Sequence, residues 1–233
     1  MEQTYPVQVR RTEIIADNTI LIETSKPDGF DFIAGQYVDL RVPNMNENED
    51  QRGRGRHMSI ASCPQEDLLL FAMRLSNSPY KKYMAQLKDG DTLEITGPFG
   101  QFTIKENLNQ PVVFLVGGIG ATPVRSMVLD AINRNSKAPI TVFASCQKPE
   151  DFAFIKEMSN VKLIQTITKP NDSWSGETGR ITLDMIKKYV ADDMSSIFYI
   201  VGSPSFADSM FLMLKNAGIP LRNMRMDRFT GYR

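Results

Sequence analysis

The pattern of apolar and polar residues changes character near residue 108. Before that point, short segments with alternating polarity are separated by turn residues, which is typical of antiparallel strands. Six strands are predicted, at 8–15, 19–24, 37–42, 56–61, 68–75 and 92–96. Their close spacing favours a small barrel or sandwich. One helix is predicted among them, over 78–87, where Ser78 can cap it and Pro79 suits its first position.

After residue 108, apolar runs of strand length alternate with segments of helical period. The strands are predicted at 112–116, 140–144, 161–166 and 197–201, and the helices at about 123–133, 149–158, 182–189 and 205–217. This alternation is the pattern of an open, mostly parallel α/β sheet, which binds ligands outside the carboxyl ends of its strands. The prediction is therefore a two-domain chain, with an antiparallel β-barrel over 1–107 and an α/β parallel-sheet domain over 108–233.

Glycines interrupt the chain between the first strand and the first helix of the second half. Gly117, Gly118 and Gly120 allow the backbone to approach a ligand closely, and the following helix start offers unpaired N–H groups that suit a phosphate. Pro123 stands where the third glycine of the dinucleotide fingerprint G-x-G-x-x-G would be, so that fingerprint is absent. By itself the turn is equally compatible with phosphate binding and with simple strand–helix packing.

Composition narrows the class of protein. The 233 residues carry 27 Lys and Arg against 27 Asp and Glu, so neither nucleic acid nor a membrane surface is expected as the main partner. The apolar runs are far shorter than the ~20 residues of a membrane span, and the first residues show no secretion signal. Cys63 and Cys146 form no metal or iron–sulfur motif. We expect a cytoplasmic protein without a metal site.

Several motifs occur in a fixed order along the chain. They are F-x-x-G-Q-Y at 32–37, R-H-M-S at 56–59, G-P-F-G-Q-F at 97–102, the glycine turn and F-T-G-Y at 229–232. Together they resemble the ferredoxin–NADP⁺ reductase superfamily over nearly the whole chain. The resemblance implies a flavin-binding barrel followed by a nicotinamide-nucleotide domain, with FAD and NAD(P)H as cofactors.

The resemblance gives roles to the R-H-M-S motif. Arg56 would bind the flavin phosphates, since a guanidinium can bridge two oxygens. Ser59 would hydrogen-bond the isoalloxazine near its reactive N5. Met58 stands where the family usually has a tyrosine stacked on the ring, and its thioether can make a sulfur–aromatic contact of ~0.3–1.5 kcal/mol. His57 belongs to the same cofactor-binding motif, and we expect its ring to face solvent.

The helix of the barrel offers a second phosphate contact by the same resemblance. Ser78 would meet the flavin pyrophosphate, and Lys81, one turn further on, could reach the same anion. Leu75 stands where the family's G-x-x-S pattern has glycine, so the match is to the serine only. A plain helix cap with a solvated lysine is the equal alternative.

In the second domain, the resemblance assigns the pyrophosphate of NAD(P)H to Gly117, Gly118, Gly120 and Thr122. Gly202, Ser203 and Pro204 resemble the family's C-G-P segment and would bring the nicotinamide near the backbone. Val201 stands where a cysteine often occurs. The alternative interpretation is a strand-to-helix turn.

The last residues resemble the family pattern E-x-F-x-G-Y. Asp227 stands at the glutamate and would assist the active site, and Phe229 or Tyr232 would cover the flavin face. The alternative is a final strand with apolar packing. Gln147 occupies the position where NADPH-dependent members often have arginine, and Lys148 follows it, so the sequence leaves NADH and NADPH both open.

The sequence thus predicts a flavin-dependent NAD(P)H oxidoreductase that passes electrons through FAD to a separate acceptor such as ferredoxin. Ser59 and Asp227 are its predicted catalytic residues. The acceptor is separate because the chain contains no ferredoxin-like cysteine cluster. Two alternatives stay open: a flavin-bearing electron-transfer component of a larger redox complex, and a non-enzymatic nucleotide-binding module.

Overall fold

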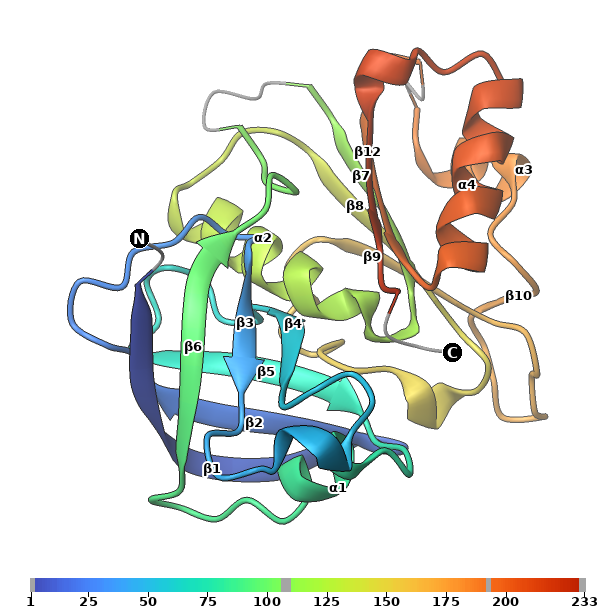
Figure 1. Ribbon diagram of the computed structural model, residues 1–233. Helices are drawn as coiled ribbons and strands as arrows, with labels where there is room; N and C mark the ends of the chain where they lie inside the picture. The colour runs from blue at the N-terminus through green and yellow to red at the C-terminus, as the bar shows by residue number, and fades with distance from the viewer. Residues whose placement is uncertain (1–2, 106–109, 192–193, 231–233) are drawn as a thin grey trace.

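The computed structural model describes residues 3–105, 110–191 and 194–230 (Figure 1). It contains two six-stranded sheets, one antiparallel and one parallel. The predicted order of elements, an antiparallel half followed by a half in which strands and helices alternate, is confirmed. The predicted domain boundary at 107/108 falls outside the described residues.

The antiparallel sheet forms the barrel, in the order β4-β3-β6-β1-β2-β5. Its strands are β1 (Thr4–Ala16), β2 (Thr19–Ser25), β3 (Tyr37–Arg41), β4 (Gly55–Ser59), β5 (Leu68–Arg74) and β6 (Thr92–Phe99). Within the described residues, no ladder joins the edge strands β4 and β5, so the barrel is open on that side. This opening leaves room for a pocket.

Two short helical segments adjoin the open side, η1 (Glu47–Glu49) and α1 (Pro79–Met84). The predicted cap is confirmed, because the Ser78 hydroxyl accepts a hydrogen bond from the Lys81 N–H at 3.4 Å. Tyr80 anchors α1 to the barrel core: it is fully buried and donates from its hydroxyl to the Leu40 carbonyl at 2.9 Å. Burial of so large an aromatic residue fixes α1 relative to the barrel.

The parallel sheet has the order β10-β9-β8-β7-β11-β12. Its strands are β7 (Val112–Gly117), β8 (Ile140–Cys146), β9 (Lys162–Ile167), β10 (Glu177–Thr178), β11 (Ile197–Gly202) and β12 (Met224–Arg228). The helical segments are η2 (Gly118–Gly120), α2 (Ala121–Asn133), η3 (Pro149–Asp151), α3 (Leu183–Tyr189), α4 (Pro204–Asn216) and η4 (Leu221–Asn223). The sheet is covered on both faces, as parallel sheets require.

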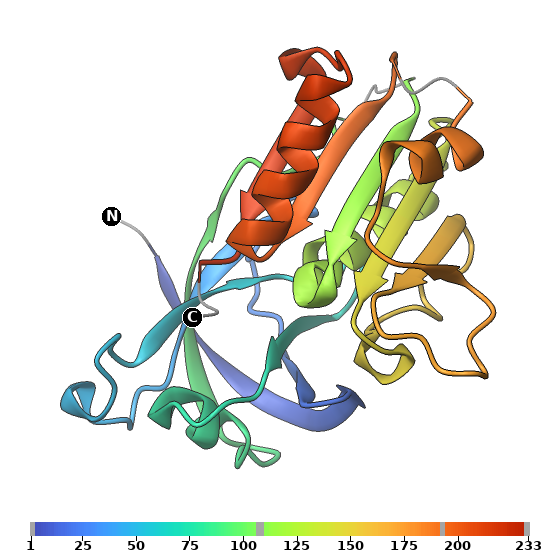
Figure 2. The same cartoon turned by 90° about the vertical axis from the view of Figure 1, so that its right-hand side faces the viewer.

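Helix α2 lies between the parallel sheet and the barrel, while α3 and α4 cover the opposite face (Figures 1 and 2). One core cluster accordingly contains side chains of both domains, such as Leu70 of the barrel, Phe114 of the sheet and Val124 of α2. The two domains therefore share one continuous apolar interior along this seam.

The seam also contains an ion pair between a buried arginine and a half-buried glutamate. The Arg125 guanidinium on α2 donates two hydrogen bonds of 2.9 Å to the Glu66 carboxylate and a third of 2.9 Å to the Ala61 carbonyl. Beside it, the Ser126 hydroxyl donates to the Ser62 carbonyl at 2.6 Å. These bonds join the first helix of the α/β domain to the chain between β4 and β5, so they fix the orientation of the barrel opening.

The predicted helix over 149–158 is wrong: only the three-residue turn η3 forms, and turns follow it. Phe152 is extended, with φ −76° and ψ 118°, and Phe154 has a left-handed φ of 61°. The Asp151 carboxylate is bound to Arg74 of the barrel at 3.1 Å. Ala153, Phe154 and Met158 are buried in the core cluster that both domains share, so packing in the seam accompanies a turn where helical period alone predicted continuation.

Candidate active site

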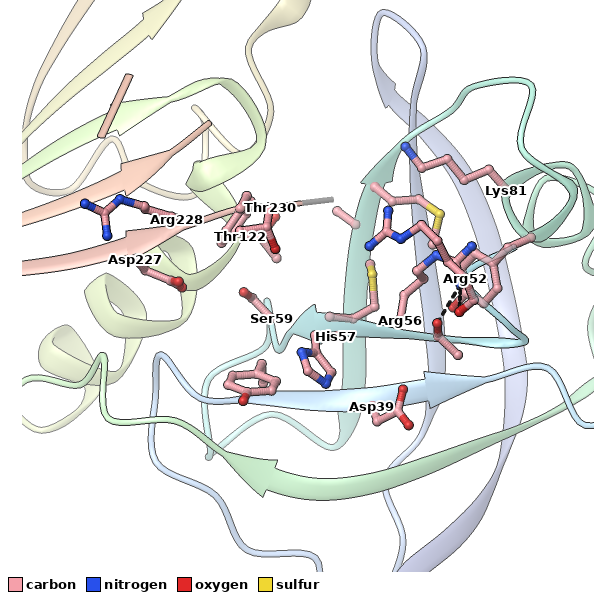
Figure 3. A pocket seen from close by; sticks show the side chains of 17 residues that line it. Asp39, Arg52, Arg56, His57, Ser59, Lys81, Thr122, Asp227, Arg228 and Thr230 are labelled. Atoms are coloured by element: carbon pink, nitrogen blue, oxygen red, sulfur yellow. Dashed lines mark hydrogen bonds between the residues drawn. The ribbon is translucent and has the colours of Figure 1, made fainter. Parts of the chain in front are cut away.

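A pocket lies at the open side of the barrel, and residues of both domains line it (Figure 3). The barrel contributes β3, β4, β5 and the start of α1, and the α/β domain contributes the start of α2 and the end of β12. The sequence-predicted residues that it brings together are Arg56, His57, Met58, Ser59, Lys81, Thr122, Asp227 and Phe229.

One part of this pocket has an aromatic wall. The rings of Tyr37 and His57, which both line the pocket, lie 5.0 Å apart between centroids. Phe99 does not line the pocket, but its ring lies 5.8 Å from that of Tyr37 and supports it. His57 is exposed, as expected, whereas Met58 is almost fully buried. Flat apolar faces beside a thioether suit a planar ring system.

Ser59 and Asp227 come from different domains and face the same space (Figure 3). Burial raises the pKa of the Asp227 carboxyl, and the hydrogen bond from the Arg228 backbone N–H offsets this only in part. Thr122, also at this end, is buried and donates its hydroxyl to the Ile119 carbonyl at 2.8 Å. The Ser59 hydroxyl and the Asp227 carboxyl therefore line the same pocket at the domain junction, and the carboxyl keeps its proton more readily than an ordinary aspartate.

The opposite end of the pocket is cationic. Burial lowers the pKa of Lys81, and the neighbouring positive charges of Arg52, Arg56 and Arg74 lower it further. Mutual repulsion among cations is relieved by a bound anion, so this end suits phosphate groups. Ser78 is not among the lining residues, and its hydroxyl serves as the plain helix cap.

Arg56 is held firmly by the protein itself. Its Nη1 donates to the carbonyls of Arg52, Gly53 and Gly55 at 3.1, 2.8 and 2.7 Å. Its Nη2 lies 2.7 Å from Oδ2 of Asp50, and the guanidinium stacks 4.6 Å from the centroid of the Tyr80 ring. The predicted phosphate ligand therefore already has a carboxylate partner.

A second pocket lies at the carboxyl ends of β7 and β8 and beside the start of α4. Gly117, Gly118 and Ser203 line it, together with Arg180 and Phe206. Gly118 has a φ of 53°, and a Cβ there would meet no atom within 4 Å, so its backbone faces open space. That geometry lets a ligand approach the chain at the start of η2.

The other predicted glycines serve close packing. A Cβ on Gly120 would lie 2.7 Å from the Val201 carbonyl oxygen, so this residue lets η2 pack on β11. A Cβ on Gly117 or Gly202 would lie 2.8 or 2.9 Å from the Phe206 ring. Phe206 thus rests on both glycines at the second pocket.

Ser203 and Pro204 begin α4. The Ser203 hydroxyl accepts a hydrogen bond from the Phe206 N–H at 3.3 Å, and Pro204 is the first residue of the helix. The segment therefore has the geometry of a capped strand-to-helix turn, which was the alternative interpretation of the sequence. Ser203 also lines the second pocket.

Phe229 lines both pockets. Its N–H donates to the Gly202 carbonyl at 2.8 Å, which extends the β11–β12 ladder by one bond. Phe229 is therefore a residue that the linings of the two pockets share. Tyr232, the other predicted aromatic cover, lies outside the described residues.

Lys148 does not line the second pocket in the described part of the chain, whereas Gln147 does. The Lys148 ammonium pairs with Asp17 of the barrel at 2.6 Å. The side-chain oxygen of Gln147 accepts a hydrogen bond from Lys169 at 3.0 Å. The cation that could have favoured NADPH is therefore engaged at the domain seam.

Three residues important for the site are not predicted from the sequence. Tyr37 ends the F-x-x-G-Q-Y motif, which could have identified it. Phe206 occurs four residues after Gly202, in a segment whose sequence signal comes from its glycine and proline. Asp50 lies in the polar stretch 44–55, which reads as a loop and carries no local signal for burial.

Within the described ranges, no group of three or more His, Cys, Asp or Glu side chains could hold a metal ion. Both cysteines are free thiols. In the same part of the chain, every helix is too short or too polar to traverse a bilayer.

Comparison with known proteins gives consistent similarities. Residues 114–210 match the model of the oxidoreductase NAD-binding domain. A component of the Na⁺-translocating NADH-quinone reductase of a Marinomonas species is 26% identical over 91% of this chain and 64% of its own length. The reductase component of propane 2-monooxygenase of Mycolicibacterium smegmatis is 25% identical over 97% and 69%, respectively.

The fold is shared with solved reductases. The structure of a ferredoxin–NADP⁺ reductase from Neisseria gonorrhoeae, which contains bound FAD and NADP, superposes with a TM-score of 0.82 at 18% identity and covers 98% of this chain and 99% of that one. The chain spans 64% of the length of the Marinomonas relative, so part of that relative lies outside the region of similarity.

Proposed function

We propose that this chain is a member of the ferredoxin–NADP⁺ reductase superfamily and an NAD(P)H-dependent flavoprotein reductase that transfers electrons through FAD to a separate acceptor. In this proposal, residues 1–107 bind the flavin and residues 108–233 bind the nucleotide. The observation that carries it is Phe229, which the linings of the two pockets share. Two cofactors that exchange a hydride must meet within contact distance.

The chemistry of the first pocket fits a flavin. The aromatic wall of Tyr37 and His57 is suited to the isoalloxazine ring, and the cations around Lys81 are suited to the phosphates. Bound FAD would supply hydride acceptance and the release of electrons to the acceptor. The protein supplies position and electrostatics.

Ser59 and Asp227 have distinct roles in this proposal. The Ser59 hydroxyl can donate a hydrogen bond to the reacting edge of the ring from the barrel side. Asp227 can hold a proton on its carboxyl, because burial raises its pKa and favours the neutral form. The raised pKa also makes a negative charge on Asp227 less favourable beside a centre that would gain electrons.

The second pocket suits a nicotinamide nucleotide. The open backbone of Gly118 at the start of η2 can receive a pyrophosphate, and Ser203 faces it from the start of α4. Phe229 lines both pockets and would exclude water from the space where the rings meet.

The acceptor is a separate molecule, and we propose a redox protein such as a ferredoxin. The described residues hold no metal-binding cluster that could accept electrons within the chain. The relatives include the reductase component of a monooxygenase and one component of a quinone reductase, both of which are parts of larger systems. A cytoplasmic location is part of the same proposal.

The test is anaerobic reduction of the FAD-loaded protein by NADH and NADPH in separate rapid-mixing experiments. The expected result is bleaching of the visible flavin absorption, followed by reoxidation when an artificial one-electron acceptor is added. A protein that binds no FAD, or that binds it and is reduced by neither nucleotide, would contradict the proposal and favour a non-enzymatic nucleotide-binding module.

A matched pair of variants distinguishes site chemistry from general effects. Asp227→Asn should slow reduction strongly while FAD stays bound. Asp208→Asn removes an exposed carboxylate whose partner is Arg228, the residue next to Asp227, and should leave the rate within about twofold. Equal rates in the two variants would remove Asp227 from the proposed site.

A further inference from the structure

Arg56 faces the flavin pocket with its positive charge already matched. Its guanidinium donates to three loop carbonyls and to Asp50, and its side chain is only 10% exposed. A cation in this condition attracts an incoming phosphate less than an unpaired one, because the nearby carboxylate cancels much of its field.

Asp50 is held in place as firmly as Arg56. Its side chain is 5% exposed, and it accepts hydrogen bonds from the backbone N–H groups of Arg52 at 2.9 Å and Tyr80 at 3.2 Å. Although burial opposes ionisation, these bonds together with Arg56 keep the pKa of Asp50 below its ordinary value, so the carboxylate is charged at neutral pH. A resident anion therefore sits beside the cationic end of the pocket.

We propose that Asp50 is a specificity-determining residue that competes with the flavin phosphates for Arg56 and so weakens the contribution of the phosphate tail to flavin binding. The inference rests on the proposed function, because it assumes that a flavin occupies this pocket. Its consequence is that recognition depends mainly on the isoalloxazine ring and on the cations other than Arg56.

The carboxylate of Asp39 gives the comparison. Asp39 lines the pocket, but its partner is Arg41, whose Nε lies 2.6 Å away and whose side chain is 46% exposed. Arg41 is not among the residues that line the pocket. Asp39 therefore has the same sign of charge as Asp50 and lines the pocket itself, but its ion-pair partner is Arg41, whereas the partner of Asp50 is Arg56.

The experiment measures equilibrium binding of FAD, FMN and riboflavin to the apoprotein by flavin fluorescence, without any turnover. Asp50→Asn should tighten FAD and FMN by about tenfold or more, since the removed charge lies next to the phosphate-facing cation. Riboflavin has no phosphate, and its affinity should stay within about twofold. Asp39→Asn should tighten FAD clearly less than Asp50→Asn.

Two further variants keep the test decisive. Asp50→Ser retains a hydroxyl acceptor for the Tyr80 N–H and should show the same preference if Asp50→Asn disturbs the loop. In the double variant Asp50→Asn with Arg56→Gln, the gain in FAD affinity should disappear, because the freed cation is what produces it.

The outcomes separate the two proposals. If the wild-type chain binds riboflavin and FAD but the Asp50 variants leave all affinities unchanged, this inference is wrong and the proposed function stands. Equal tightening by the Asp39 and Asp50 variants, or a gain that persists without Arg56, would also overturn it. Failure of the wild-type chain to bind any of the three flavins would overturn the proposed function and this inference with it.

Discussion

Replacing Arg125 by methionine tests whether the seam between the domains depends on the ion pair of this buried arginine with Glu66. The guanidinium makes two hydrogen bonds of 2.9 Å to Glu66 and one of 2.9 Å to the Ala61 carbonyl. Removing one partner of a buried pair typically costs about 3–5 kcal/mol. Because the Glu66 side chain is 31% exposed and water can reach it, we expect the lower end, about 3 kcal/mol.

Chemical denaturation at neutral pH measures this loss directly, and thermal unfolding should show a decrease in Tm of about 6–12 °C. The control is Arg11→Met, which removes an exposed pair with Glu13 whose side chains are 59% and 46% accessible. Such pairs contribute at most about 1 kcal/mol. A loss below about 1 kcal/mol for Arg125→Met would refute the reasoning that this pair secures the seam.

The same pair predicts a dependence on pH. Arg125 holds the pKa of Glu66 below its ordinary value of 4.5, together with the Cys63 backbone N–H and against the effect of burial. The stabilisation is therefore complete above that ordinary value and is lost as pH falls through the folded-state pKa. The difference in unfolding free energy between wild type and Glu66→Gln should be largest near neutrality and should shrink below about pH 4. A difference that is constant over this range would contradict the assignment.

Three further predictions concern the pockets. Asp227→Asn should lower kcat/KM for nucleotide oxidation by about 10²-fold. It should not destabilise the protein at neutral pH, because burial already disfavours the charged form of Asp227. A large loss of Tm would argue for a structural role of Asp227 instead. Gly120→Ala should cost about 1–3 kcal/mol in a denaturation experiment, since its Cβ would lie 2.7 Å from the Val201 carbonyl oxygen; unchanged stability would show that η2 can move away from β11. Lys148→Ala should change the ratio of the KM values for NADPH and NADH by no more than about twofold relative to wild type, because Lys148 pairs with Asp17. An increase in the KM for NADPH alone, measured by steady-state kinetics, would show that Lys148 binds the 2′-phosphate.

Much of the fold could be predicted because its signals are local. The change from alternating polarity to strand–helix alternation near residue 108 indicated both sheets, and Ser78 with Pro79 indicated the start of α1. The failed helix over 149–158 shows the limit. There, Phe154 has a left-handed φ and is buried with Ala153 and Met158 in the core shared with the barrel, and such tertiary packing overrides the local helical period.

The candidate site was predictable where a motif carries the residue. The R-H-M-S motif and Asp227 meet in one pocket, although they lie far apart in the chain. Asp50 could not be predicted, because a polar loop residue becomes a buried anion only when Tyr80 supplies its N–H from a different element. The ion pair of Lys148 with Asp17 could not be predicted either, because it joins residues of different domains that are distant in the sequence.

The register of β12 determines which charge the active site contains. Asp227 pairs with Val201 and Arg228 with Gly202, and the Arg228 side chain donates to Asp208 at 2.7 Å. Figure 3 shows the Arg228 side chain pointing away from Ser59. Since neighbouring residues of a strand point to opposite faces, a slip of one residue would exchange the carboxyl for a guanidinium. The pairing of β12 with β11 therefore decides whether a carboxyl or a guanidinium faces the proposed site, and a variant that shifts this pairing by one residue should lose electron transfer even where the chain still folds.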